Sequence, residues 1–203
     1  MAIRYKVYQS EYPYHIYNRT NNKEYIFDLP LTYQIFLESL KFAAKKTQFI
    51  LHHFVLMTNH YHLMGTTPKA NLNEFMLIFQ TTFSKRLNNT IGRRNHIFGG
   101  RYGATVINTE AYLAHLVRYI YHNPVKADLA SSPFTYPFSS LKLYQNGTLF
   151  GDGTLLKPDP YLDGLTPQLR FKELTRLCEM NLSDNDYSLI KKKLKQKYFN
   201  FEL

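Results

Sequence analysis

Two histidines stand one residue apart in the run TNHYHLM, inside a longer segment with the composition of β-strands. Because side chains alternate along a strand, His60 and His62 would project from one face and Tyr61 from the other. Two imidazoles placed in this way can bind one cation. Two ordinary histidines on the surface of a strand would fit the same pattern. A metal site needs further ligands, and no acidic residue lies close to the pair in the sequence.

The run RYIYHNP, about 60 residues downstream, contains candidates for the rest of such a site. On a helix, Tyr119 and Asn123 are separated by about 40° around the axis, so they share one face. Tyr121 is the competing phenol, but it points about 160° away from Asn123 by the same geometry. An activated tyrosine can attack a phosphodiester and form a covalent intermediate while a metal polarises the phosphate. The alternative is a helix flank of ordinary interface tyrosines.

The elements that would position these residues follow the order β-α-β-β-α-β, with a third helix after them. Strands are predicted at 12–19, as a pair within 48–65, and at 101–108, and helices at 31–46, 71–92 and 109–124. This order matches the split βαβ, or ferredoxin-like, plan, in which two helices cover one face of a four-stranded antiparallel sheet. Pro124 is expected to stop the third helix, which can lie across the other face. The fold class predicted is α+β, with an extra catalytic helix and a C-terminal helical extension.

The composition changes after the third helix. Residues 145–165 are rich in Gly, Pro and Asp, which is typical of a loop or linker, and two helices are predicted after them. The second of these begins at Ser183, which stands three residues before Asp186 in the spacing of a capping box. We therefore expect a main domain over 1–144, followed by a linker and helical extension over 145–203.

The charge of the chain favours a polyanionic partner. The sequence has 25 Lys and Arg against 15 Asp and Glu, a net charge of +10, and a pI near 9.5. Nucleic acid is the first candidate and an anionic membrane surface the second. The N-terminal segment lacks a signal-peptide h-region, and no apolar run is long enough to span a bilayer. With Cys178 as the single cysteine, these features predict a protein of the reducing cytoplasm, associated with the nucleoid.

Five ordered blocks resemble a known family. They are YHIYNR at 14–19, FVLMTNHYHLM at 54–64, IFGGRYGATVI at 97–107, YLAHLVRYIYHNPVKADL at 112–129 and YPFSS at 136–140. The chain closely resembles the single-tyrosine HUH transposases of the IS200-like type, and within them the REP-associated tyrosine transposases of bacteria. It departs from the usual pattern at Tyr61, which is more polar than the typical residue between the histidines, and at Thr20, where a glycine is common.

This resemblance implies a metal-dependent transposase that cleaves and rejoins single-stranded or hairpin DNA through a tyrosine linked to the 5′ phosphate. By position, Tyr119 would be the nucleophile, and His60, His62 and Asn123 would be ligands of Mg²⁺ or Mn²⁺. Imidazole chemistry also admits Zn²⁺. The implied substrate is a repeat-derived hairpin with a flanking single-stranded segment. A monomer is favoured, because the tail after Tyr144 resembles the REP-associated members; a homodimer that exchanges the tyrosine helix is the alternative.

Single-strand binding usually combines a basic groove with aromatic platforms. The phosphate contacts predicted are Arg101 and Arg118 within the matched blocks, together with Arg19, Lys85, Arg86, Arg93 and Arg94. Tyr14, His15 and Arg19 on the first strand are candidates for reading bases. Two other functions fit the residues: a domesticated protein that holds hairpin DNA or RNA without cutting it, and a metal-dependent hydrolase that uses water while Tyr119 is structural.

Overall fold

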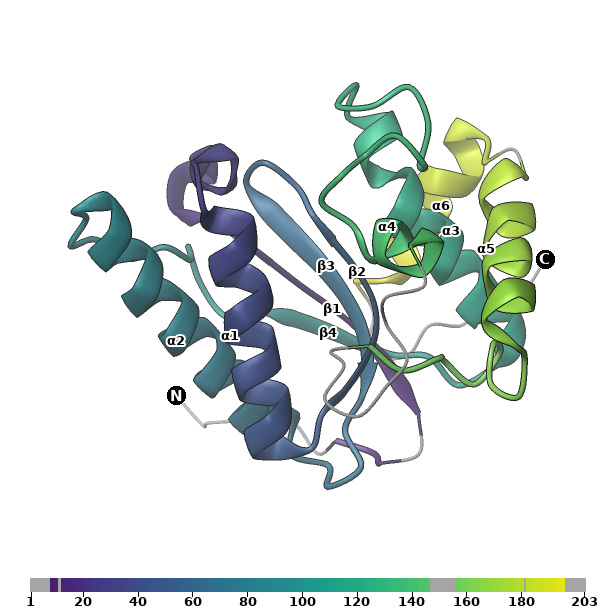
Figure 1. Ribbon diagram of the computed structural model, residues 1–203, viewed down its shortest axis with the longest axis horizontal. Helices are drawn as coiled ribbons and strands as arrows, with labels where there is room; N and C mark the ends of the chain where they lie inside the picture. Colours follow the sequence, from purple (N-terminus) through teal and green to yellow (C-terminus); the bar gives the residue numbers. More distant parts are fainter. Residues whose placement is uncertain (1–7, 11, 147–155, 181, 196–203) are drawn as a thin grey trace.

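The structure is a computed structural model that describes residues 8–10, 12–146, 156–180 and 182–195. Four strands form one antiparallel sheet in the order β2-β3-β1-β4 (Figure 1). The strands are β1 (Pro13–Arg19), β2 (Ile50–Leu56), β3 (His60–Thr66) and β4 (Gly103–Val106). This topology confirms the predicted α+β class with a four-stranded antiparallel sheet.

Two helices cover one face of the sheet, and they are α1 (Thr32–Thr47) and α2 (Leu72–Ile91) (Figure 1). Short 3-10 turns, Asn21–Lys23 and Ile26–Asp28, connect β1 to α1. Helix α2 ends as predicted at Gly92, whose φ of 67° is the left-handed conformation that glycine adopts most easily.

Helix α3 (Glu110–Lys126) lies on the opposite face of the sheet from α1 and α2 (Figure 1). It runs two residues past Pro124, so the prediction that this proline stops the helix is wrong. Proline removes only its own N–H, and Ala127 still donates its N–H to the carbonyl of Asn123 at 3.1 Å. The helix therefore completes a last turn after the proline.

Three further helices follow, and they are α4 (Ser140–Gln145), α5 (Pro167–Glu179) and α6 (Asp184–Lys193). The short helix α4 has no counterpart in the predicted elements. Helix α6 begins as predicted, because the Ser183 hydroxyl accepts the backbone N–H of Asp186 at 3.1 Å. Within the described part of the predicted linker, Leu156 forms a parallel bridge to Leu51 of β2. The domain boundary at 144 stays a prediction.

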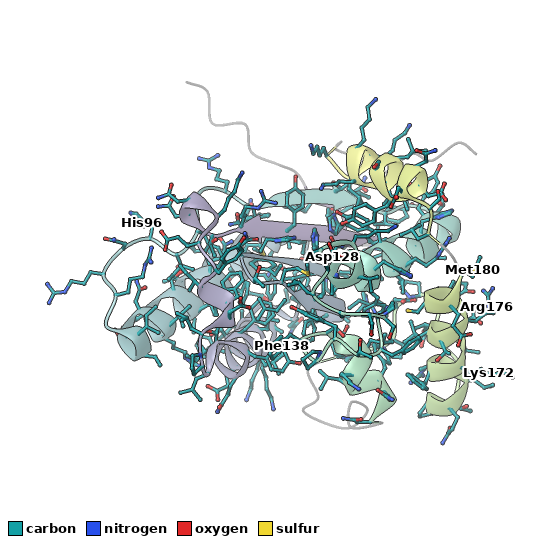
Figure 2. All side chains as sticks on the ribbon, turned by 90° about the horizontal axis from the view of Figure 1, so that it is seen from above. His96, Asp128, Phe138, Lys172, Arg176 and Met180 are labelled. Carbon is teal, nitrogen blue, oxygen red and sulfur yellow. The ribbon has the colours of Figure 1, made fainter. Side chains whose placement is uncertain are left out.

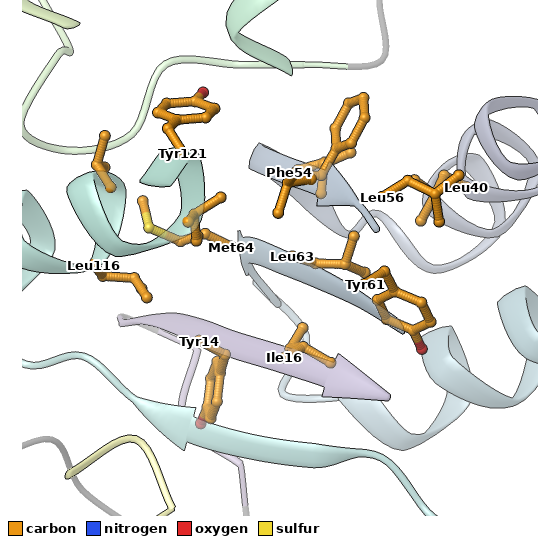
Figure 3. Packing of buried hydrophobic residues seen from close by; sticks show 14 of the residues in the cluster. Tyr14, Ile16, Leu40, Phe54, Leu56, Tyr61, Leu63, Met64, Leu116 and Tyr121 are labelled. Atoms are coloured by element: carbon orange, nitrogen blue, oxygen red, sulfur yellow. The ribbon is translucent and has the colours of Figure 1, made fainter. Parts of the chain in front are cut away.

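The alternation of β3 divides its side chains between two buried layers (Figure 3). Tyr61 and Leu63 face α1 and α2, whereas Met64 faces α3 and lies near Leu116. Tyr61 is fully buried, and its hydroxyl accepts a hydrogen bond from Gln80 of α2 at 3.0 Å. Tyr61 therefore packs in the core between the sheet and α1 and α2, on the opposite face from the two histidines, as strand alternation predicts. Within the described residues, no helix is both long and apolar enough to cross a membrane.

Candidate active site

A cavity of about 560 Å³ lies between the α3 face of the sheet and helix α6. Its lining includes His60 and His62 of β3, Tyr119 and Asn123 of α3, and Tyr187 of α6. The structure thus brings together the four residues that the sequence predicts for the site, and adds a fifth that the sequence does not predict.

Strand β3 presents the two histidines side by side, with ring centroids 5.2 Å apart and planes at 84°. Nδ1 of His60 lies 2.8 Å from Oδ1 of Asn59, which as a carbonyl oxygen can only accept. His60 therefore carries its proton on Nδ1 and keeps a lone pair on Nε2. Nδ1 of His62 lies 2.9 Å from Nε2 of His15 on β1. In both histidines Nδ1 has a partner, which leaves Nε2 as the free nitrogen.

Burial keeps these histidines neutral. It is the main reason that the pKa of His60 falls to about 4, and the positive charges of Arg19 and Lys191 lower it further. Burial, followed by the neighbouring His15, holds the pKa of His62 well below its ordinary value. Both imidazoles are uncharged at neutral pH, and uncharged imidazole is the form that binds a metal.

Helix α3 places Tyr119 and Asn123 over the histidines, as their four-residue spacing predicts. The ring of Tyr119 is buried and meets that of His62 edge to face, with centroids 5.5 Å apart. The Asn123 amide donates through Nδ2 to the backbone carbonyl of Tyr119 at 2.7 Å. Tyr121 points away, and its hydroxyl lies 2.6 Å from Nδ1 of His53. It therefore cannot share the cavity with Asn123.

Helix α6 covers the phenol of Tyr119. The ring of Tyr187 stacks on that of Tyr119 at 4.9 Å, and its hydroxyl donates to Oδ1 of Asn123 at 2.7 Å. An ion pair of 2.6 Å between Lys126 and Asp184 also joins α3 to α6. Burial, followed by the neighbouring Tyr187, raises the pKa of the Tyr119 phenol. In this arrangement the phenol is protonated and shielded from a large substrate.

Of the predicted DNA contacts, Arg19 lines the cavity with an exposed side chain. Arg118 does not line the cavity, and its role as a DNA contact stays a prediction. It is 8% exposed, and its guanidinium donates to the carbonyl of Met180 at 3.4 Å, at the end of α5 (Figure 2). Tyr14 and His15 are also buried, so neither can read a base in this arrangement.

The remaining predicted contacts lie outside the cavity, and they are Lys85, Arg86, Arg93, Arg94 and Arg101. Two of them are already paired, Arg86 with Glu38 at 3.2 Å and Arg93 with Glu24 at 2.5 Å. The loop after α2 that carries Arg93 lies near His96, at the end of the molecule opposite α5 (Figure 2). These residues do not line the cavity around Tyr119, and their contacts to DNA stay predictions.

The sequence interpretation missed Tyr187. Lys191 of α6 and Lys195 just after it also line the cavity, and they belong to the run KKKLKQK, whose sequence is equally consistent with a contact to a DNA hairpin stem and with a solvated helix face. Tyr187 stands four residues before Lys191, so both share one face of α6. That spacing could have indicated a mixed aromatic and basic face, but nothing local shows what the face covers.

The candidate metal ligands form a small and uncharged set. Among the described residues, no group of three or more His, Cys, Asp or Glu side chains is placed to hold a metal ion. The set in the cavity consists of two imidazoles and one amide. Two free Nε2 atoms beside an amide fit a divalent cation that obtains its remaining ligands, and its charge balance, from phosphate oxygens.

A ferredoxin-like sheet with two histidines on one face, a tyrosine helix above them and basic residues at the rim defines a class of DNA-processing enzymes. The family described as IS200-like transposase matches residues 8–123, more than half of the chain. The protein therefore belongs to the IS200-like transposase family.

The fold is also similar to that of a solved structure. A REP-associated tyrosine transposase, solved bound to a REP hairpin, matches with a TM-score of 0.62 and 18% sequence identity over 81% of this chain and 96% of that one. A candidate transposase from Deinococcus radiodurans R1 matches with a TM-score of 0.42 and 16% identity over 59% of this chain and 94% of that one. No curated protein matches the sequence.

Proposed function

We propose that this transposase is a metal-dependent nickase and strand transferase that cleaves and rejoins single-stranded or hairpin DNA. The main support for the proposal is that one cavity is lined by Tyr119 and Asn123 of α3 and by His60 and His62 of β3. A protein that only bound DNA would have no need to group a buried phenol, amide and imidazole with a second, half-buried imidazole.

In the proposed reaction Oη of Tyr119 attacks the scissile phosphorus. The Tyr119 O–P bond forms as the P–O3′ bond breaks, which gives a 5′-phosphotyrosine and a free 3′ hydroxyl. The phenolic proton leaves and the departing 3′ oxygen gains one, so the step balances without a nucleotide cofactor. Attack by a 3′ hydroxyl on the phosphotyrosine reverses the exchange, rejoins the strand and restores Tyr119.

His60 and His62, through Nε2, and Asn123, through its amide oxygen, would hold Mg²⁺ or Mn²⁺. The metal would neutralise and polarise the scissile phosphate. Asn123 must first release the hydroxyl of Tyr187. The described residues that line the cavity include no carboxylate, so lysines near the rim, such as Lys126 and Lys191, would stabilise the phenolate and the phosphate charge.

The proposed substrate is a DNA hairpin with a flanking single strand, held in the cytoplasm by a monomer. The similar solved structure contains a REP hairpin, and the net charge of +10 suits a polyanion. Arg19, Lys191 and Lys195 at the cavity would contact the strand near the scissile phosphate. The paired Arg86 and the buried Arg118 are left out of this set.

A covalent-trapping assay tests the proposal. Hairpin oligonucleotides labelled at the 3′ end are incubated with the protein, with and without Mg²⁺ or Mn²⁺, and separated under denaturing conditions. A 5′-phosphotyrosine retains this label on the protein. We expect an adduct that needs metal, that disappears in Tyr119→Phe and that persists in Tyr121→Phe. An adduct in Tyr119→Phe would contradict the assignment, and cleavage without any adduct would favour hydrolysis by water.

The covering of Tyr119 by α6 favours one alternative, a protein that binds hairpins without cutting them. This alternative predicts that the wild type binds a hairpin tightly and that neither the wild type nor Tyr187→Ala forms an adduct. Adduct formation by either protein would exclude it.

A further inference from the structure

His15 of β1 faces the cavity but has no part in the proposed reaction. It is 1% exposed, and its ring stacks on that of His62 with centroids 5.1 Å apart and planes at 13°. Its Nε2 lies 2.9 Å from Nδ1 of His62. The same ring meets that of Tyr119 edge to face at 6.0 Å. His15 thus contacts both a proposed metal ligand and the proposed nucleophile.

The proton between the two rings decides whether His62 can bind a metal. Between two neutral imidazoles one nitrogen must donate and the other accept. If His15 donated, the proton of His62 would lie on Nε2, and the nitrogen free for a ligand would have no lone pair. If His15 accepts, the proton of His62 lies on Nδ1 and its Nε2 can coordinate. His60 has this second arrangement, because Asn59 can only accept.

The fold itself gains little from a histidine at this position. Among the described residues, Nδ1 of His15 has no hydrogen-bond partner, and the contact to His62 is its one polar contact. Burying a ring nitrogen without a partner disfavours folding, so an apolar ring would suit the core better. Buried polar atoms without partners often have a functional reason.

We propose that His15 is a positioning residue that accepts the Nδ1 proton of His62, and so holds the tautomer and ring orientation in which Nε2 is a metal ligand. The inference rests on the proposed function, because it takes His62 as a ligand. A hydrogen-bond partner on the second ring nitrogen of a ligating histidine commonly fixes its tautomer and raises its affinity for the metal. The partner here is another imidazole instead of a carboxylate.

The tautomer can be measured without metal. In protein with ¹⁵N-labelled histidine, long-range ¹H–¹⁵N spectra distinguish a protonated Nδ1 from a protonated Nε2. We expect His62 of the metal-free wild type to carry its proton on Nδ1. His15→Phe should shift His62 towards the other tautomer, and His15→Gln, whose amide oxygen can accept, should restore it. A wild-type His62 protonated on Nε2 would overturn the proposal, whether or not either variant folds.

Binding of Mn²⁺, measured by calorimetry, gives a second readout. We expect His15→Phe to weaken binding about 10- to 100-fold and His15→Gln to recover most of the loss. His52→Phe is the matched control, since it replaces another buried histidine of the sheet, which is bonded to Thr66 outside the cavity. It should leave Mn²⁺ affinity unchanged. Equal affinity in wild type and His15→Phe would overturn the role of His15.

The two proposals fail in different ways. A wild type that does not bind Mn²⁺ would contradict the metal site, and the tautomer of His62 would still test His15. Wild-type affinity in His15→Phe, with an unchanged tautomer, would contradict the inference alone.

Discussion

At the scale of single residues, the chemistry of the site depends on where protons lie on buried rings. His60 and His62 are neutral because burial opposes their charge. His60 keeps Nε2 available because its Nδ1 donates to Asn59, and His62 does so when His15 accepts its Nδ1 proton, as we propose. Burial also favours the neutral form of Tyr119, which for a phenol is the protonated one.

Buried histidines also make stability depend on pH. His52 is 4% exposed, and burial, as the largest cause, lowers its pKa to about 4. Below the unfolded value near 6.5 the unfolded chain binds the proton and the folded chain does not, so stability falls as pH falls from about 6.5 towards 4. We expect the stability advantage of the wild type over His52→Phe to shrink by about 2 kcal/mol between pH 6.5 and pH 5. Urea unfolding at both pH values measures it, and a difference that did not change would contradict it.

The side chain of Tyr17 on β1, which lines the cavity, leaves no room for a Cβ atom at Gly103 of β4. A Cβ at position 103 would lie 2.3 Å from the Tyr17 ring, whereas one at Gly100 would meet nothing within 4 Å. We therefore expect Gly103→Ala to cost about 1–3 kcal/mol of unfolding free energy and Gly100→Ala to cost little. In a Tyr17→Ala background the cost of Gly103→Ala should largely disappear. A cost that persisted there would show that the clash is not with Tyr17.

At the scale of elements, α6 controls access to α3. Tyr187 stacks on Tyr119 and donates to the amide oxygen of Asn123, so we expect the proposed attack on a phosphate to require a movement of α6. The helix is held by the contacts of Tyr187, by the fully buried Ile190 and by an ion pair with Lys126. Ser183 caps its N-terminus, and the cap and the ion pair are weak restraints.

Replacing Tyr187 by alanine should therefore expose the nucleophile. We expect faster formation of the 3′-labelled adduct in Tyr187→Ala, and a smaller increase in Ser183→Ala, which weakens the cap by about 1 kcal/mol. Leu189→Ala, a change at an exposed position of the same helix, is the control and should leave the rate unchanged. A slower reaction in Tyr187→Ala would instead assign Tyr187 to the reaction itself.

The opposite side of α3 is anchored by a buried polar network. Nε2 of His53 lies 2.5 Å from Asp159, and its Nδ1 lies 2.6 Å from the hydroxyl of Tyr121. Burial would raise the pKa of the Asp159 carboxyl, but the hydrogen bond and charge of His53 hold it below the ordinary value. The network joins the segment after residue 155 to β2 and to the helix that carries Tyr119.

Breaking this buried pair should be costly. We expect Asp159→Asn to lower the unfolding free energy by about 3–5 kcal/mol, because His53 then loses its charged partner. Tyr121→Phe removes the hydrogen bonds of one hydroxyl to His53 and Ser140 and should cost about 1–2 kcal/mol. Denaturant unfolding of both variants measures the difference. Near-equal losses of unfolding free energy in the two variants would show that the charge of the Asp159 carboxylate is not the main stabilising part of the network.

At the scale of the whole molecule, the net charge of +10 is distributed over a large surface, and only some of it surrounds the cavity. Two of the arginines predicted to contact DNA have partners within the fold, since Arg93 pairs with Glu24 and Arg118 is buried against the end of α5. Total charge therefore indicates a polyanionic partner, whereas the cavity indicates where its reactive phosphate would lie.

Salt dependence of binding tests that distinction. Each phosphate contact on a single strand changes the slope of log K against log salt by about 0.7. We expect Arg19→Ala and Lys191→Ala each to reduce the slope by about that amount. Lys172→Ala, on the far surface of α5 (Figure 2), should leave it unchanged. Fluorescence anisotropy with a labelled hairpin measures these slopes, and equal slopes for all three variants would contradict the proposed DNA path.

Much of the fold follows from local patterns in the sequence. The order of strands and helices, the opposite faces of His62 and Tyr61, and the shared face of Tyr119 and Asn123 depend on periodicities of two and 3.6 residues. Such periodicities are properties of a single segment, so the sequence alone is enough to predict them. The capping of α6 by Ser183 is local in the same sense.

Other features were decided only by the tertiary structure. The hydrogen-bond partner of His62 comes from a neighbouring strand, and the ring that covers Tyr119 belongs to Tyr187 of α6, a separate helix near the end of the described chain. Arg118 is buried by packing against the end of α5. Contacts between distant segments depend on the packing of the whole chain, which periodicity within one segment does not specify. The sequence by itself determined which groups the site contains, and the packing decided which of them are free to react.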